Sequence, residues 1–300
     1  MSAPTKLRVA VLRGGPSHAY EESLKSGSHV LSLLREMPEQ YEPLDIFISR
    51  EGDWHHNGVV TNPHQVLSKA DVVWNALHGS YGEDGQIQRL LENLQIPFTG
   101  SGITASAFAT NKDIAKELYL RHSLLTPSFT SLYANNFTDE QLVEVFRKHL
   151  HPVIVKPANG VRALGVRIAH TFQELKDAVM KAFESSPKVI VEEYVRGTVS
   201  SCVVVENAKG EKLYTLIPSA RQPVEINKQI EAMAKVAHEV LGQRHYSSSD
   251  FIISPKGKVY ILETNSLPVF HEGSPVHHSL LATGWQPKDF VDHCLKLTLE

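Results

Sequence analysis

Residues 246–268, which read YSSSDFIISPKGKVYILETNSLP, form the stretch from which the fold prediction starts. Apolar runs at 251–253 and 259–262 flank a Pro-Lys-Gly tripeptide, and this pattern favours two strands joined by a tight turn. A turn centred between Lys256 and Gly257 makes the two strands an antiparallel β-hairpin. The apolar residues on both sides of the turn indicate that the hairpin is buried within a larger sheet.

Three polar residues of this hairpin are predicted to share one face. The turn places Asp250 opposite Glu263, with Cβ atoms about 5 Å apart, and Asn265 lies two residues further along the same face. Two carboxylates at that distance repel each other unless a cation lies between them. Mg²⁺ (or Mn²⁺) prefers such oxygen ligands, so we predict a metal site. The alternative is a surface hairpin with two solvated acids, but a buried setting makes unpaired carboxylates costly.

The composition excludes several classes of protein. With 300 residues and 42% hydrophobic content, the chain is long enough for two or three domains. Its net charge of −3 does not indicate binding to nucleic acid or to a membrane surface. Cys202 and Cys294 show neither a metal-type spacing nor a disulfide framework, which suits a reducing compartment. We find no signal peptide and no apolar run of membrane-spanning length. These features predict a cytoplasmic globular enzyme.

The N-terminal third has the pattern of a doubly wound α/β domain. An apolar strand at 7–12 ends in two glycines, a helix follows, and further strands are predicted at 44–49 and 71–77. The last of these runs into the loop HGSYGEDG at 78–85, and open α/β sheets bind ligands at the carboxyl ends of such strands. We place the end of this N-terminal substrate domain at about residue 103.

The remaining two thirds are predicted to form an α+β region with two subdomains, 104–193 and 194–300. In the first, a strand closes on Lys156 and returns as a hairpin at 166–168, and another strand ends in Glu192 and Glu193. In the second, a long helix at 224–241 precedes the hairpin, and a closing helix is predicted at 289–299.

Five blocks of the sequence carry a family resemblance. In order and spacing they resemble the blocks of D-alanine–D-alanine ligases, which belong to the ATP-grasp superfamily. The resemblance covers nearly the whole chain, and the second block is specific to this family. The blocks are VAVLRGGPSHAYEESLKSG, NALHGSYGEDGQIQRLLENLQIPFTGSGITASAFATNKDIAK, PVIVKPANGVRALGV, KVIVEEYVRG and SSDFIISPKGKVYILETNSLP.

The resemblance implies an ATP-grasp fold with an N-terminal doubly wound domain, and a cytoplasmic, dimeric enzyme that joins two D-alanines at the expense of ATP for peptidoglycan synthesis. It implies four substrate-binding residues. Glu21 and Ser23 stand where the ligases contact the ammonium group of the first D-alanine. His78 stands near that substrate's carboxylate, and Ser274 stands at the carboxylate of the second.

The resemblance also implies a nucleotide site and repeats the metal prediction. Lys112 and Lys156 match the two lysines on the nucleotide phosphates, and Arg162 could contact phosphate by charge. Glu192, together with Glu193 and the strand that follows, matches the side of the family's nucleotide site that recognises the adenine ring. The Mg²⁺ ligands of the family match the three hairpin residues already singled out, Asp250, Glu263 and Asn265.

Several positions depart from the family pattern. Ser248 stands where the family has an arginine, two residues before the metal aspartate. That arginine donates to the oxyanion, and its absence costs about 3–4 kcal/mol at the transition state unless another basic residue, such as Arg244 or Arg221, substitutes for it. Two hydroxyl donors are absent from the segment at 160–163, Val199 replaces a ribose-binding glutamate, and Val269 a glycine. Residues 217–223 are a short substitute for a longer lid loop, which predicts a more open site.

These departures leave two alternatives to a D-alanine–D-alanine ligase. One is an ATP-grasp ligase for a different acid and amine, and the other is a nucleotide-binding pseudoenzyme without turnover. Individual residues also have structural alternatives: Glu21 and Ser23 can belong to a helix N-terminus, His78 can be a hydrogen-bonded structural histidine, and Lys112 can pair with an acid on a solvated helix face.

Overall fold

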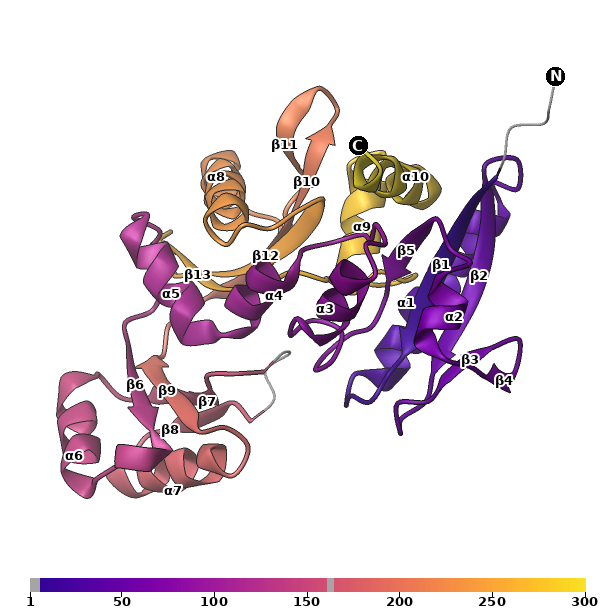
Figure 1. Ribbon diagram of the computed structural model, residues 1–300. Coiled ribbons are helices and arrows are strands. Elements are labelled where there is room, and N and C mark those ends of the chain that lie inside the picture. The colour runs from indigo at the N-terminus through magenta and orange to yellow at the C-terminus, as the bar shows by residue number, and fades with distance from the viewer. Residues whose placement is uncertain (1–5, 161–164) are drawn as a thin grey trace.

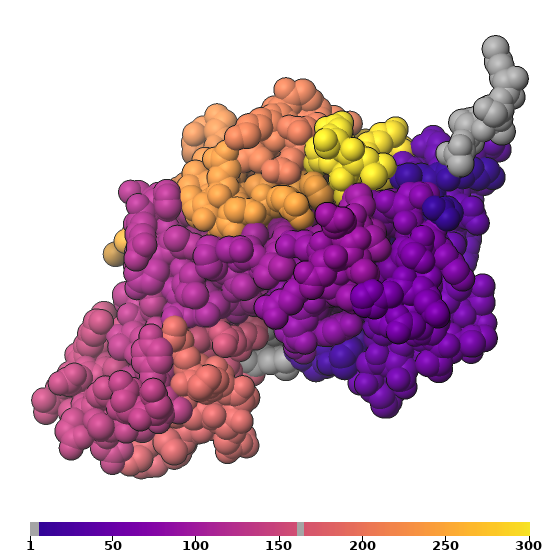
Figure 2. All heavy atoms as spheres, in the orientation of Figure 1, coloured from indigo at the N-terminus to yellow at the C-terminus, as the bar shows by residue number. Residues whose placement is uncertain are grey.

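The computed structural model describes residues 6–160 and 165–300, and Figure 1 shows these residues arranged around three sheets. We call them the N-terminal sheet, with five strands, and the central and C-terminal sheets, with four strands each. Figure 2 shows that the central part, residues 129–160 and 165–193, projects from the rest of the molecule. Within the described residues, no helix has the length and apolar character needed to cross a membrane.

The N-terminal sheet is doubly wound, as predicted. Its strand order is β4-β3-β2-β1-β5, and β1 pairs in parallel with β2 and β5, whereas β3 and β4 add an antiparallel hairpin at one edge. Alternate side chains of β1 point to opposite faces of the sheet and enter two different hydrophobic clusters. Both faces of the sheet are therefore covered by helices. The elements are β1 (Leu7–Gly14), α1 (Tyr20–Arg35), β2 (Tyr41–Ile48), β3 (Trp54–His56), β4 (Val59–Val60), α2 (Pro63–Leu67), β5 (Val72–Asn75) and α3 (Gln86–Asn93).

One glycine allows α1 to approach β1 closely. A Cβ atom on Gly27 would lie 2.4 Å from the Cβ of Arg13, so any larger residue would force the helix away from the sheet. The Arg13 guanidinium is then held by the Asp45 carboxylate on the neighbouring strand at 2.6 Å. This packing fixes the glycine turn at the end of β1 against the start of α1.

The central sheet is antiparallel throughout, with the order β6-β9-β7-β8. The predicted hairpin of β7 and β8 is confirmed, whereas β6, η1 and α6 were not predicted from the sequence. Two helices cover one face, and the other face turns Ile154, Lys156 and Glu192 toward the C-terminal sheet. The elements are β6 (Phe129–Tyr133), η1 (Ala134–Asn136), α6 (Asp139–Lys148), β7 (Val153–Pro157), β8 (Arg167–Ala169), α7 (Phe172–Phe183) and β9 (Lys188–Glu193).

The C-terminal sheet has the order β11-β10-β12-β13 and is also antiparallel. One face packs on α8, with Phe251 and Ile261 in the shared core, and the other face turns Asp250 and Glu263 toward the central sheet. The elements are β10 (Thr198–Ala208), β11 (Glu211–Thr215), α8 (Val224–Val240), β12 (Tyr246–Ile253) and β13 (Val259–Asn265).

The hairpin of β12 and β13 pairs Asp250 with Glu263, as predicted, but the predicted turn is wrong by one residue. Next to the turn, Ile253 opposes Val259, whereas the predicted register would pair it with Tyr260. Residues 254–258 connect the two strands, with Gly257 at a φ of 75°. An irregularity between Asp250 and Phe251 shifts the register by one residue and brings the two carboxylates opposite each other.

Two pairs of helices pack against elements outside their predicted subdomain, and the domain boundaries themselves stay predictions. Helices α4 (Ile103–Thr110) and α5 (Lys112–Arg121) were assigned to the central subdomain, but they contact β13 and share a hydrophobic cluster with α8. The closing helices α9 (Pro275–Ala282) and α10 (Pro287–Thr298) complete a core that includes residues of the N-terminal sheet. Burial of apolar helix faces against elements far away in the sequence explains both differences.

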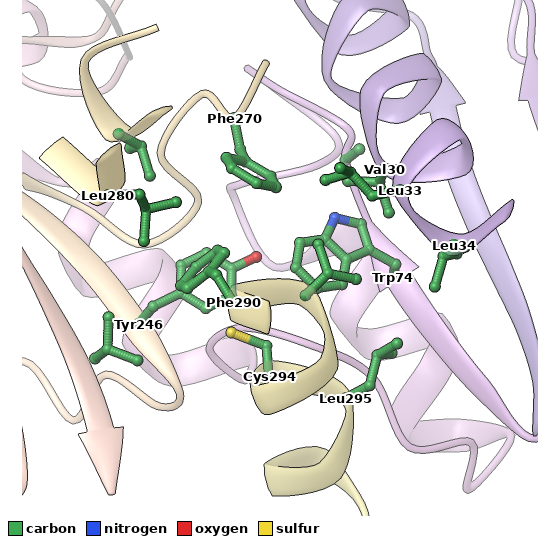
Figure 3. Packing of buried hydrophobic residues seen from close by; sticks show 14 of the residues in the cluster. Val30, Leu33, Leu34, Trp74, Tyr246, Phe270, Leu280, Phe290, Cys294 and Leu295 are labelled. Atoms are coloured by element: carbon green, nitrogen blue, oxygen red, sulfur yellow. The ribbon is translucent and has the colours of Figure 1, made fainter. Parts of the chain in front are cut away.

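The aromatic core beside the N-terminal sheet joins three distant parts of the chain (Figure 3). The Phe290 ring on α10 lies 6.4 Å from Trp74 on β5, 5.5 Å from Tyr246 on β12 and 5.2 Å from Phe270, measured between ring centroids. Phe290 is completely buried. The N-terminal and C-terminal sheets are therefore held together by one continuous apolar cluster.

We predict that Phe290→Ala lowers the free energy of unfolding by about 3–5 kcal/mol, because it removes a buried ring and leaves a cavity. Denaturant unfolding followed by circular dichroism measures the change. Leu281→Ala is the control, since this leucine is 46% exposed on α9, and it should cost less than about 1 kcal/mol. Equal effects of the two substitutions would contradict the assigned core.

Candidate active site

A cavity of about 310 Å³ lies between the central and C-terminal sheets. Part of its wall is apolar, with Ile154 from β7, Val199 from β10, Ile252 from β12 and Leu262 from β13. Its charged residues come from α5, β7, β9, β12 and β13. Apolar walls with a few convergent charged groups are typical of a site for a small molecule that carries a flat ring and a charged tail.

Glu192 lies at the bottom of this cavity between two lysines. Its carboxylate oxygens are 2.7 Å from Nζ of Lys156 and 2.9 Å from Nζ of Lys116. Burial alone would raise the pKa of Glu192, but the two ammonium groups hold it below its usual value. Glu192 is therefore ionised and is engaged by lysines on both oxygens. Glu193, next along β9, also lines the cavity and accepts a hydrogen bond from the Ser128 hydroxyl at 3.3 Å.

The predicted metal ligands Asp250 and Glu263 both line the cavity. Lys112, at the start of α5, places its Nζ 2.9 Å from Glu263 and donates a hydrogen bond to the Gly160 carbonyl at 2.6 Å. Burial favours the neutral form of Glu263, but Lys112 outweighs this effect and keeps the pKa of that carboxyl low. Burial raises the pKa of Asp250 to about 6, the Glu263 charge adds to the rise, and the Ser201 hydroxyl, 2.5 Å away, opposes it.

The donor set at this end of the cavity fits Mg²⁺. Asp250 and Glu263 occupy opposed positions, and Asn265 lies two residues beyond Glu263 on the same face of β13, opposite Ser248. Two carboxylates and an amide supply only oxygen ligands to a hard cation, which leaves room for water and phosphate oxygens. Burial, and to a smaller extent the Glu263 charge, disfavours the ionised form of Asp250, and a divalent cation bound here would favour that form.

His78 is buried in the glycine-rich loop after β5. Its Nε2 is 2.8 Å from the Ser26 hydroxyl of α1, and its Nδ1 is 3.3 Å from the Glu83 carboxylate. Glu83 is also buried and accepts a hydrogen bond from the Gly79 amide at 2.9 Å. The sequence pattern placed this acid in a ligand-binding loop but did not single it out. The hydrogen-bonded setting of His78 is the structural alternative that the sequence left open.

The structure gives Glu21 and Ser23 no place in the cavity. The Glu21 carboxylate is exposed and pairs with Arg50 at 2.9 Å. The Ser23 hydroxyl is fully buried, accepts a hydrogen bond from the Gly14 amide and donates one to the Ala76 carbonyl. Both side chains belong to the first turn of α1, where Ser23 links that helix to two strands. This geometry agrees with the structural alternative for the pair, and their contact with the first substrate stays a prediction.

Ser274 is the N-cap of α9, and its hydroxyl accepts the His277 amide at 3.3 Å. The preceding His271 is 2.9 Å from the Glu22 carboxylate of α1, so this cap lies against the N-terminal part. Arg162 falls outside the described residues. Its predicted contact with phosphate therefore stays a prediction, as does the substrate role of Ser274.

The two arginines considered as substitutes at Ser248 lie elsewhere. Arg244 donates to the Gly100 carbonyl and stacks on Phe98, so its guanidinium is engaged beside the N-terminal sheet. Arg221 is exposed in the short loop at 217–223. The neighbouring Ser219 of that loop is bonded through its amide and hydroxyl to Ser201 of β10, so the loop runs along the strand whose Ser201 holds Asp250.

Two facing antiparallel sheets that hold a cavity with paired lysines and paired acids define the ATP-grasp class. The D-ala D-ala ligase N-terminus model matches residues 56–101, and the D-ala D-ala ligase C-terminus model matches 119–219 and 214–296. The chain is 34% identical over 310 residues to D-alanine–D-alanine ligase of Cupriavidus metallidurans, covering 95% of this chain and 89% of that protein. The chain therefore belongs to the D-alanine–D-alanine ligase family.

Solved structures agree on the fold. The D-alanine-D-alanine ligase from Coxiella burnetii matches with a TM-score of 0.88 at 22% identity, covering 98% of this chain and 94% of that one. D-alanine–D-alanine ligase from Bacillus anthracis complexed with ATP matches with a TM-score of 0.80 at 24% identity, covering 98% and 97%. At these identities the likeness concerns the fold alone.

We predict that Glu192→Ala destabilises the protein by about 3–5 kcal/mol, because it leaves two buried ammonium groups without their shared carboxylate. Thermal and denaturant unfolding measure the change. Glu193→Ala is the matched control on the adjacent, partly exposed residue and should change stability by less than about 1 kcal/mol. A Glu192→Ala protein as stable as the control would show that the lysines do not depend on this carboxylate.

Proposed function

We propose that this protein joins two D-alanines into a dipeptide in an ATP-dependent reaction that supplies peptidoglycan synthesis. The observation that carries the proposal is the cavity between the two sheets, in which Lys112 and Lys156 lie beside Asp250 and Glu263. Family membership supports the choice of substrates. In this reaction the carboxylate of the first D-alanine attacks the γ-phosphate of ATP, giving an acyl phosphate and ADP. The amine of the second D-alanine then displaces inorganic phosphate.

The residues of the cavity have separate tasks in this proposal. The apolar wall with Val199, Ile252 and Leu262 receives the adenine, and Glu193 lies at its rim. Lys112 and Lys156 bind the phosphates as compact charges. Their ammonium groups compensate charge on the transferring phosphoryl group, so that positioning and electrostatics supply most of the rate enhancement.

Asp250, Glu263 and Asn265 would hold Mg²⁺ (or Mn²⁺). When bound, the ion would compensate the negative charge of the phosphates. Lys112 pairs with Glu263 in the structure, so it must turn at least partly from that carboxylate when a cation and phosphate arrive. His78 and Ser274 stay candidates for contacts to the amino acid substrates.

Ser248 favours a second candidate function, the ligation of a different acid and amine. The family arginine is absent from this position, and Arg244 is engaged elsewhere. A second substrate whose carboxylate does not need that arginine would suit the site better. A nucleotide-binding protein without turnover is the remaining alternative. Family resemblance also supports a homodimer, and the two unpaired, buried cysteines suit a cytoplasmic location.

The proposal predicts that the protein releases phosphate from ATP in the presence of Mg²⁺ and D-alanine, and that mass spectrometry detects D-alanyl-D-alanine. Glu263→Gln should abolish both, because it removes one carboxylate of the metal site while keeping the size of the side chain. Phosphate release without dipeptide, stimulated by another amino acid or hydroxy acid, would favour the second candidate. ATP binding without any turnover would leave the non-catalytic alternative.

We predict that Ser248→Arg raises kcat for dipeptide formation by roughly tenfold or more, because a single oxyanion donor is worth about 10²–10³ in rate. Ser248 is on the same face of β12 as Asp250, two residues away. Ser248→Met is the control for size, and steady-state kinetics with a melting curve for each variant measure the effect. If both variants keep wild-type activity while remaining folded, this position does not face the reacting groups.

A further inference from the structure

Lys116 is a buried lysine that lies behind the cavity rather than in its wall. Its side chain has no exposed surface, and it is absent from the residues that line the cavity. Its Nζ donates a hydrogen bond to the Thr126 hydroxyl at 2.6 Å, lies 3.5 Å from the Pro127 carbonyl and lies 2.9 Å from Glu192. All three of these contacts are to the protein, and none is to the space of the cavity.

Lys156 differs from Lys116 in its access to the cavity. It lines the cavity, and its Nζ lies 2.7 Å from the other oxygen of Glu192. An ammonium group has three donors, so Lys156 keeps donors that a phosphate can use. One carboxylate is thus shared between a lysine that can reach a ligand and a lysine that cannot.

We propose that Lys116 is a positioning residue for nucleotide binding, because it takes up half of the Glu192 carboxylate and so leaves Lys156 with a net positive charge toward the phosphates. The inference rests on the proposed ATP-dependent function. Two ammonium groups and one carboxylate give this group a net charge of +1. Without Lys116, Glu192 would neutralise Lys156, and the group would present no net charge to the triphosphate.

Three observations favour this role over a purely structural one. A buried ion pair contributes little net stability compared with apolar residues of the same volume, so stability alone is a weak reason for a charge here. Burial lowers the pKa of Lys116 to about 8, which leaves it mainly charged at neutral pH. The Lys116 chain also holds Glu192 from the side away from the cavity, which orients that carboxylate toward Lys156.

The test compares ATP with adenosine, which carries the same ring and sugar but no phosphates. Isothermal titration calorimetry measures both affinities for wild type, Lys116→Met, and the double variant Lys116→Met with Glu192→Gln. We expect Lys116→Met to raise the Kd for Mg-ATP on the order of tenfold, through loss of one unit of positive charge near the phosphates. The Kd for adenosine should stay within about twofold.

The double variant restores the net charge of +1, because it removes one positive and one negative group together. Its Kd for Mg-ATP should return to within about threefold of wild type, and it keeps the test valid if Lys116→Met alone unfolds. Lys176→Met, on the exposed face of α7, is the control for loss of a lysine in the same sheet layer and should leave both affinities unchanged.

Three results would overturn the inference. One is a parallel loss of ATP and adenosine affinity in Lys116→Met, which would indicate a distorted site. Another is an unchanged ATP affinity in that variant. The third is a double variant that binds ATP at least tenfold more weakly than wild type. Failure of the wild-type protein to bind ATP at all would instead refute the proposed function, so the two failures are distinguishable.

Discussion

The repulsion between Asp250 and Glu263 governs the charge distribution of the cavity. The two carboxylates lie opposite each other on β12 and β13 in a largely buried setting, where like charges repel strongly. Lys112 from α5 offsets part of this repulsion by pairing with Glu263, while burial, with the Glu263 charge as a smaller cause, raises the pKa of Asp250 to about 6. The deficit of positive charge at this point is what a metal ion and its nucleotide can correct.

The charged group around Glu192, which lines the same cavity, has the reverse arrangement. There Lys116 and Lys156 share the single carboxylate of Glu192, so positive charge is in excess. A nucleotide with its metal ion carries both signs of charge and can complement both groups. The two sheets place these groups by strand alternation, since residues on β7, β9, β12 and β13 that face away from the helices face each other across the cavity.

Much of this arrangement is predictable from the sequence. Strand periodicity and the Pro-Lys-Gly turn predict that Asp250 opposes Glu263, although the real turn and the real irregularity each shift the register by one residue and compensate for each other. Family blocks place Lys112, Lys156 and Glu192, which the structure brings to one cavity. The substrate contacts of Glu21 and Ser23 stay predictions, because a matching block does not determine which way the side chains of a helix point.

Other features depend on contacts between distant segments and have no local signal. The sequence shows that Lys112 and Lys116 are one helical turn apart, but not that Lys116 is buried against Glu192. It shows an apolar closing helix, but not that Phe290 packs on Trp74 of the first sheet. The sequence shows that the loop at 217–223 is shorter than the lid loop of the family. Only the structure shows that Ser219 of this loop is hydrogen-bonded to Ser201, whose hydroxyl is hydrogen-bonded to Asp250.

The proposed reaction is tested most directly by following one oxygen atom of the D-alanine carboxylate. D-alanine labelled with ¹⁸O in its carboxylate is incubated with the protein, ATP and Mg²⁺, and the released phosphate is analysed by mass spectrometry. Attack of that carboxylate on the γ-phosphate predicts that each phosphate released carries one labelled oxygen, because the acyl phosphate transfers it when the second amine displaces phosphate. Unlabelled phosphate from consumed ATP would show that water is the attacking group, and would contradict the assignment of this site to peptide-bond formation.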